Sequence, residues 1–171
     1  MPRIASLTDN QAAGARPILD AVRAKLGMVP NVVRTLANSP AALRGYLSLS
    51  EALSGGSFTA AERETVALAV GQANACGYCL SAHTLMAQGA GLSPDAVLAA
   101  RQGEGSPLAA FARKVTTSRA TLSNQEMNDA RAMGLSDAQM VEVIAHVALN
   151  TLTNYVNHIA ATEIDFPVVA V

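Results

Sequence analysis

The residues of this sequence best suited to chemistry are two cysteines three positions apart, Cys76 and Cys79, followed four positions later by His83. On a helix that starts near Cys76 these positions share one face, so Cys79 and His83 would be able to touch. A thiol acts as a nucleophile in its ionised form. Unpaired amides at a helix start and a neighbouring imidazole both favour that form. The spacing therefore predicts a reactive thiolate on an exposed helical edge.

The second cysteine adds redox chemistry to this nucleophile. Two cysteines at this spacing can close a disulfide within one chain, so a sulfur oxidised by a substrate can be resolved by its neighbour. Cys76 and Cys79 therefore predict a redox dithiol.

An acidic residue, Glu64, precedes Cys76 by eleven intervening positions. On a helix Glu64 shares a face with Leu68, Gly71 and Ala75, a small and apolar stripe that we expect to face the next helix and its cysteines. The carboxylate either lies near a helix start, where the dipole favours negative charge, or is held near the site to move protons. The spacing leaves both interpretations open.

Other types of site compete with the dithiol. Cys76 and Cys79 could be small buried hydrophobic residues without chemistry. A structural zinc site needs four ligands, so a distant His146 or His158 would have to complete the local set. Covalent haem attachment is excluded because Leu80, not a histidine, follows the second cysteine.

The composition indicates the elements that must hold these residues. Of the 171 residues 50% are hydrophobic and 15% charged, which excludes a disordered chain. The formal charge of −1 argues against nucleic acid or an anionic membrane as a partner. About a fifth of the residues are alanine and only 4% are aromatic. Because alanine favours helices and disfavours strands, we expect an all-α fold.

Capping signals divide the chain into about eight helices joined by short turns. Three capping boxes begin at Thr59, Ser123 and Ser136, and Ser93-Pro94 and Ser106-Pro107 mark two further helix starts. The other expected helices cover residues 11–25, 31–38, 41–53 and 76–88. No linker interrupts them. The sequence therefore predicts one helical bundle over residues 1–171, with its redox core at about 59–91.

The last and longest expected helix, residues 137–162, carries two kinds of side chain. Its apolar positions keep a helical period: Val141, Ile144, Ala148, Leu152 and Val156. His146, Asn150 and Asn154 form a polar stripe along the same helix, and Asn157 and His158 lie beyond it. We interpret the polar stripe as a solvated or subunit-facing edge and His146 as a buried histidine with its hydrogen bonds satisfied. The half-apolar composition also suggests that some helix faces are buried between subunits.

No apolar run approaches the roughly 20 residues of a membrane-spanning helix. The first residues lack the apolar core of a secretory signal. We therefore expect a cytoplasmic protein with no membrane partner.

The arrangement of Glu64, Cys76, Cys79 and His83 resembles the active-site signature of the alkylhydroperoxidase D-like (AhpD-like) branch of the carboxymuconolactone decarboxylase superfamily. Residues 26–31, 36–40 and 157–167 are similar to peroxidase-related members of that branch, so the resemblance covers nearly the whole chain.

This resemblance implies an all-helical homo-oligomer, as a dimer, trimer or trimer of dimers. It implies an antioxidant thiol peroxidase that reduces hydroperoxides without haem, flavin or metal. Cys79 would be the peroxidatic thiolate, Cys76 the resolving partner, His83 the base for Cys79 and Glu64 part of the proton relay. An external dithiol, such as a lipoyl-bearing protein or thioredoxin, would reduce the disulfide.

One residue departs from the family pattern. The well-studied peroxidase of this branch has a second histidine directly before its second cysteine, and this chain has Tyr78 there. The resemblance therefore leaves open the complete proton relay, the rate of peroxide reduction and the identity of the reductant. The alternative function is a redox-sensing or thiol–disulfide exchange protein with little peroxide turnover. Lactone decarboxylation is disfavoured because that branch works without a cysteine pair.

Overall fold

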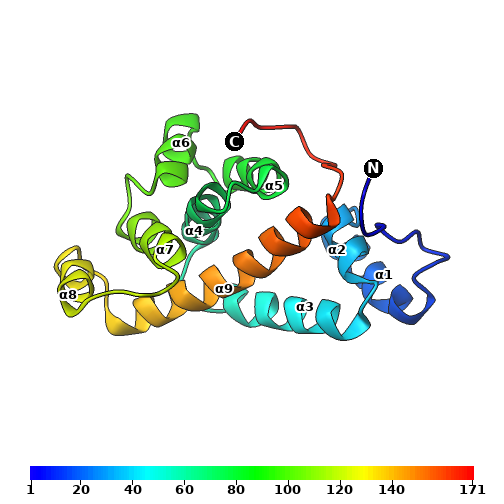
Figure 1. Ribbon diagram of the computed structural model, residues 1–171, viewed down its shortest axis with the longest axis horizontal. Coiled ribbons are helices and arrows are strands. Elements are labelled where there is room, and N and C mark those ends of the chain that lie inside the picture. Colours follow the sequence, from blue (N-terminus) through cyan, green and yellow to red (C-terminus); the bar gives the residue numbers. More distant parts are fainter.

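The computed structural model describes residues 1–171 and is entirely helical, as the sequence predicts (Figure 1). Nine α-helices and one short 3-10 helix follow one another as η1 (Ala13–Ala15), α1 (Arg16–Leu26), α2 (Asn31–Leu36), α3 (Pro40–Ser54), α4 (Ala60–Ala73), α5 (Gly77–Gly89), α6 (Pro94–Gln102), α7 (Pro107–Thr117), α8 (Asn124–Ala132) and α9 (Asp137–Ala160).

The helices begin where the capping signals place them. Thr59, Ser123 and Ser136 each form a complete capping box at the starts of α4, α8 and α9. The first helix is the exception, because α1 begins at Arg16 and not at residue 11. Pro17 explains the difference, since proline is favoured in the first turn of a helix and not in its interior.

Helix α4 is the centre of the bundle, where it packs against α5, α6, α7 and α9 (Figure 1). Helix α9 crosses the whole molecule and also contacts α2 and α3. One hydrophobic cluster fills the space between α4, α7 and α9, and a second cluster contains both cysteines. Because α5 contacts both α4 and α9, the start of α5, which carries the cysteines, lies in the interior of the bundle.

The polarity of α9 is the reverse of the expected one. Asn150, Asn154 and Asn157 are buried, so the predicted solvated or subunit-facing edge faces the interior of the chain instead. The exposed face carries the large apolar side chains, with Val141 67% and Ile159 64% exposed. Buried amides are tolerated when they are hydrogen-bonded, and most of these are.

His146 is buried as expected, at 3% exposure, but it is not fully satisfied. Its ring packs against Phe58 with the centroids 5.7 Å apart, and its Nε2 atom has no hydrogen-bond partner. Burial is the largest influence on this ring and lowers the pKa of His146. His146 is a core residue that packs against Phe58 of the first cluster and makes no hydrogen bond to either cysteine.

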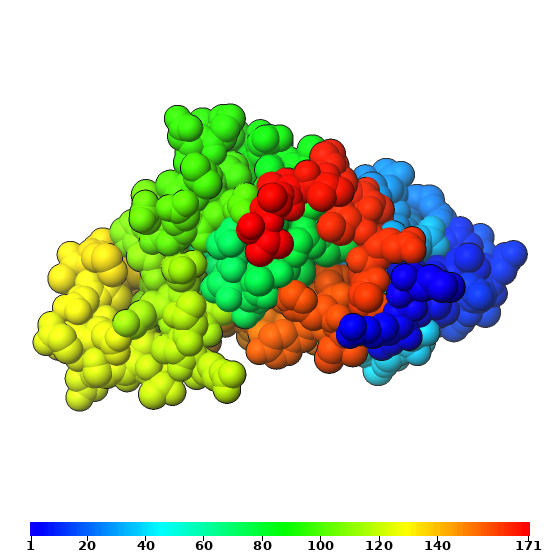
Figure 2. Space-filling model, turned by 45° about the horizontal axis from the view of Figure 1, so that its top comes forward, coloured from blue at the N-terminus to red at the C-terminus, as the bar shows by residue number.

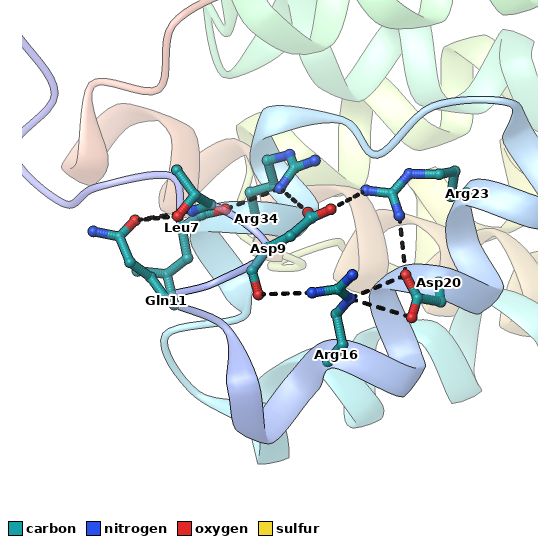
Figure 3. Close-up of polar contacts among 8 residues, drawn as sticks. Leu7, Asp9, Gln11, Arg16, Asp20, Arg23 and Arg34 are labelled. Carbon is teal, nitrogen blue, oxygen red and sulfur yellow. Dashed lines mark hydrogen bonds and ion pairs between the residues drawn. The ribbon is translucent and has the colours of Figure 1, made fainter.

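A polar network fixes the N-terminal segment to α1 and α2 (Figure 3). Asp9 pairs with Arg23 at 2.7 Å and with Arg34 at 2.8 Å. These guanidinium groups, chiefly Arg34, lower the pKa of Asp9. Asp20 in turn bridges Arg16 and Arg23 along α1. The network holds the N-terminal half of the second cluster in place.

The C-terminal segment, residues 161–171, returns across the bundle to α5 (Figures 1 and 2). The backbone N–H of Val169 donates to Ser81 Oγ at 3.1 Å, and Arg101 donates to the Ala170 carbonyl at 2.6 Å. The segment thereby covers the first turns of the helix that carries the cysteines. None of the helices combines the length and the hydropathy that a membrane-spanning segment requires.

Candidate active site

A tight turn between α4 and α5 places the two cysteines at the start of α5. Ala75 adopts a left-handed conformation with φ of 52°, and the Cys76 N–H donates to the Gly71 carbonyl at 2.9 Å. Cys76 is the N-cap of α5, and its sulfur accepts the backbone N–H of Cys79 at 3.3 Å. A sulfur at this position receives the favourable field of the free amides at a helix start.

The two thiols are free and their Sγ atoms lie 2.6 Å apart. Cys76 is 1% exposed and Cys79 is 3% exposed, so the predicted exposed edge is wrong for the sulfurs. The reason is packing, because α5 begins beneath the C-terminal segment and against α4 and α9. The pair is sealed from bulk water but close enough to form a disulfide with little movement.

Two amide groups from α9 contact the sulfur of Cys79. Asn154 donates from Nδ2 at 2.9 Å, and Asn157 donates from Nδ2 at 3.4 Å. The Oδ1 atom of Asn157 is buried and has no partner. Sequence reasoning missed both residues, although their spacing on α9 was a signal. Amides that repeat at helical spacing mark a face, and here that face points at the cysteines.

A third asparagine holds the first one in place. Asn74, the C-cap residue of α4, donates from Nδ2 to Asn154 Oδ1 at 2.8 Å. The carbonyl oxygen of Asn74 accepts from Nε2 of His158 at 2.8 Å. Because Asn154 Oδ1 already accepts a hydrogen bond, its NH₂ group must face the sulfur.

Glu64 and His83 form a second pair beside the cysteines. Glu64 Oε2 lies 2.8 Å from His83 Nδ1, and their side chains are 18% and 19% exposed. This position agrees with the interpretation that places the Glu64 carboxylate near the site, where it could move protons. His83 hydrogen-bonds this carboxylate and neither sulfur, so the expected direct contact with Cys79 is absent. The imidazole and the sulfurs share one region without touching.

The two sulfurs differ in acidity. The hydrogen bond with Cys79 outweighs burial and, with the Cys79 backbone N–H, lowers the pKa of Cys76 to about 7. The same hydrogen bond and burial raise the pKa of Cys79. The pair thus behaves as one site that loses its first proton near neutral pH and holds its second strongly. The structure assigns the more acidic position to Cys76, which the sequence analysis placed in the resolving role.

The imidazole of His83 is tuned by opposing effects. Burial lowers the pKa of His83, but the charge and hydrogen bond of Glu64 outweigh burial, and the net pKa is raised. Tyr46 of α3 also lies near the site and was missed from the sequence. Burial, followed by the charges of Cys79 and Glu64, raises the pKa of Tyr46 to about 12.

Tyr78 does not replace the family's second histidine in contact with the sulfurs. Its hydroxyl accepts the Val32 N–H at 3.1 Å and donates to Asp165 Oδ1 at 2.7 Å. Burial and this carboxylate raise the pKa of Tyr78. The ring meets Phe166 edge to face with centroids 5.6 Å apart. Tyr78 therefore fastens the C-terminal segment to α2 and α5.

The site offers thiol and acid–base groups. No group of three or more histidine, cysteine or acidic residues lies close enough to hold a metal ion. His158, one of the two distant candidates for a zinc ligand, is hydrogen-bonded to Asn74. Two sulfurs, two amide donors and a Glu–His pair are the groups that a thiol-based redox reaction uses.

Three solved structures share this fold over almost the whole chain. An uncharacterized peroxidase-related protein from Silicibacter sp. TM1040 has a TM-score of 0.78 at 22% identity, covering 94% of this chain and 92% of that one. A variant of the debrominase Bmp8 in complex with 2,3,4-tribromopyrrole has a TM-score of 0.78 at 21% identity, covering 95% and 91%. The AhpD core of an uncharacterized peroxidase-related protein from Ralstonia eutropha JMP134 has a TM-score of 0.71 at 24% identity, covering 95% and 93%.

The search of curated proteins found no match. Residues 40–121, which hold Glu64, Cys76, Cys79 and His83, match the model of the carboxymuconolactone decarboxylase family. The family match and the AhpD-like fold are both consistent with the resemblance found in the sequence. Residues 40–121 thus match the carboxymuconolactone decarboxylase family, and the chain as a whole has the AhpD-like fold.

Proposed function

We propose that this protein is a thiol-dependent hydroperoxidase that works through a dithiol–disulfide cycle of Cys76 and Cys79. The observation that carries the proposal is the pair itself, with sulfurs 2.6 Å apart at a helix start and a first ionisation near neutral pH. The thiolate populated near pH 7 is that of Cys76, and its position beside Cys79 supports resolution of an oxidised Cys79. Attack by Cys79 itself is supported by the family resemblance and by the two amide donors on its sulfur.

In the oxidative half of the cycle, the Cys79 thiolate attacks the terminal oxygen of a hydroperoxide. The O–O bond breaks, the sulfur becomes a sulfenic acid, and the alkoxide takes a proton to leave as an alcohol. His83, whose pKa Glu64 raises, is the group proposed to supply that proton. The sulfur of Cys76 then attacks the oxidised sulfur, the S–O bond breaks, the thiol proton of Cys76 passes to the departing hydroxide to form water, and the disulfide forms.

In the reductive half, an external dithiol exchanges with the disulfide, is itself oxidised and restores both thiols. A lipoyl-bearing protein or thioredoxin is the proposed reductant, and no bound cofactor is required by this chemistry. The unpaired Asn157 Oδ1 beside the sulfurs supports a hydroperoxide as the substrate, because that acceptor can take the O–H of the peroxide.

The test is peroxide consumption with a dithiol reductant by single-cysteine variants. We expect Cys79→Ser to abolish consumption and Cys76→Ser to permit about one turnover per chain, since the sulfenic acid then has no resolving partner. The reverse pattern would exchange the two roles, in keeping with the lower pKa of Cys76. Unchanged turnover in both variants would refute the dithiol cycle.

Peroxide consumption by the wild-type protein distinguishes the proposed peroxidase from the alternative redox-sensing function. A redox sensor would consume peroxide only in proportion to its thiols, whereas an enzyme continues while reductant lasts. Assay of 2,3,4-tribromopyrrole alongside an alkyl hydroperoxide tests debromination, the chemistry named for the fold relative Bmp8. Turnover of the pyrrole alone would contradict the peroxidase assignment.

We also propose that the protein assembles as a homo-oligomer through α9. The exposed face of α9 carries Leu152, Tyr155 and Ile159, at 41%, 58% and 64% exposure. Together with Leu36 of α2 and Ala42 of α3 they line a groove of about 320 Å³. Contiguous exposed apolar surface of this kind marks an interaction site.

A further inference from the structure

Two asparagines of α9 converge on Cys79, and neither belongs to the predicted set of site residues. The Asn154 and Asn157 side chains are 0% and 6% exposed, so water does not compete for their amides. Their Nδ2 atoms lie 2.9 Å and 3.4 Å from the same sulfur. A neutral thiol is a weak acceptor, whereas a thiolate is a strong one. Buried donors aimed at a sulfur therefore favour its charged form.

We propose that Asn154 and Asn157 form an amide cradle that stabilises negative charge on Cys79, and that Asn74 positions the cradle. The proposal rests on the proposed dithiol chemistry. It adds to that chemistry the donors that stabilise the thiolate when it attacks and when it is released from the disulfide.

The two sulfurs share one proton, so the donors around each decide where the charge of the pair resides. Cys76 accepts one backbone N–H from α5, at 3.3 Å, and the Asn157 amide also lowers the pKa of Cys76. Cys79 accepts two side-chain amides from α9, the nearer at 2.9 Å. The amide cradle thus counteracts the preference of the pair for charge on Cys76. The amide cradle stabilises the thiolate of Cys79, which is the form that acts as a nucleophile.

The role of Asn74 follows from the direction of the hydrogen bonds. Asn74 donates to Asn154 Oδ1 at 2.8 Å, which keeps the oxygen of Asn154 away from the sulfur. An amide turned the other way would place that oxygen against the thiolate and repel it. Asn74 contacts no sulfur and acts through Asn154, while its own carbonyl is held by His158.

The same donors act on the reductive half of the cycle. An external thiolate attacks the sulfur of Cys76, the S–S bond breaks, and Cys79 leaves as a thiolate that accepts both amides. Loss of a donor raises the energy of the reduced form and leaves the disulfide less affected. The disulfide is then harder to reduce.

The test measures the pKa of Cys79 from thiolate absorbance at 240 nm against pH. The background is Cys76→Ser, which isolates one sulfur and retains an N-cap side chain. In this background we expect Asn154→Leu to raise the pKa by about one to two units, because a hydrogen bond to a charged group is lost. Asn157→Leu should raise it less, since its contact is longer. Asn154→Asp should raise it at least as much as Asn154→Leu, because it adds negative charge.

Thr153→Val is the matched control. Thr153 is also buried on α9 and donates only to the Asn150 carbonyl, so its loss should leave the pKa of Cys79 unchanged. Asn74→Ala should raise the pKa of Cys79 when Asn154 is present. Added to Asn154→Leu, it should not change the pKa of Cys79 further. That non-additivity identifies a positioning role.

An unchanged pKa in folded Asn154→Leu, or an equal shift in Thr153→Val, would overturn the proposal. If Asn154→Leu does not fold, Asn74→Ala at the end of α4 carries the test by itself. In the two-cysteine protein, the Asn154→Leu disulfide should need a stronger reductant. Neither measurement uses peroxide turnover, so the amide cradle can stand if the peroxidase assignment fails.

Discussion

At the scale of single residues, the acidity of Cys76 determines how the protein responds to pH. Its folded pKa of about 7 lies below the usual thiol value, so the thiolate persists until the pH falls through about 7. Alkylation by iodoacetamide should therefore rise with pH to a midpoint near 7, where an ordinary thiol gives about 8.5. Cys79→Ala should move the midpoint upward, because the hydrogen bond from Cys79 is the largest cause of the shift. A midpoint unaffected by Cys79→Ala would show that the sulfurs titrate independently.

A second residue-scale prediction concerns the Glu64–His83 pair. Glu64→Gln removes the charge that raises the pKa of His83 and leaves the effect of burial, which lowers it. We expect the pKa of His83 to fall below its usual range, so that the ring is neutral at pH 7. The C2 proton resonance of His83, followed by NMR against pH, measures this directly. Glu51→Gln, an exposed change on α3, should leave that resonance unchanged, and equal shifts in both variants would contradict the pairing.

Spacing alone indicated that Cys76, Cys79 and His83 share one helix face, and the family resemblance added Glu64 to the predicted site. The sequence was not sufficient for Asn154, which lies 75 positions beyond Cys79 and reaches it only through the packing of α9. A contact between distant segments depends on helix crossing geometry, which no local pattern encodes. The direct contact of His83 with Cys79 failed for a related reason, since Glu64 competes for the same imidazole.

At the scale of elements, Gly71 lies where α4 packs against α5. A Cβ at this position would lie 3.5 Å from Leu80 Cδ2 and 3.7 Å from Cys79 Cβ, which is ordinary contact. Alanine is also the better helix former. Gly71→Ala should therefore raise the free energy of unfolding by about 0.5–1 kcal/mol, as measured by urea denaturation.

Gly103→Ala is the contrasting variant. Gly103 has φ of 76°, and a Cβ there would lie 2.5 Å from the Arg113 side chain. This substitution should lower the free energy of unfolding. If both glycine variants destabilise the protein equally, the space described between α4 and α5 is not present.

Most helix positions followed from local signals, and the orientation of α9 did not. Capping boxes and proline preferences act within one turn, so they can be recognised in any fold. The choice of which face of α9 is buried depends on the rest of the molecule. The buried face combines apolar side chains such as Val143 and Val147 with the amides of Asn150, Asn154 and Asn157, whose hydrogen bonds inside this bundle make their burial possible.

At the scale of the whole molecule, the exposed face of α9 should control assembly. We expect Ile159→Lys to shift the protein toward a smaller species in size-exclusion chromatography with light scattering, because a charge is placed in the proposed interface. Leu98→Lys, at an apolar position on α6 that is 53% exposed against 64% for Ile159, should not. Circular dichroism of both variants should show unchanged helix content. A single species of chain mass in the unmodified protein would contradict assembly through α9.

The C-terminal segment gives the molecule a property that the composition does not indicate. Asp165 is bonded to Tyr78 and to the Asn31 N–H, and Val169 to Ser81, so the covering over the dithiol is fastened at several points. We therefore expect the reactivity of the sulfurs to depend on the size of the reagent. Slender oxidants such as hydrogen peroxide need only a brief fluctuation to enter, while a bulky aromatic disulfide such as Ellman's reagent must wait until the segment detaches.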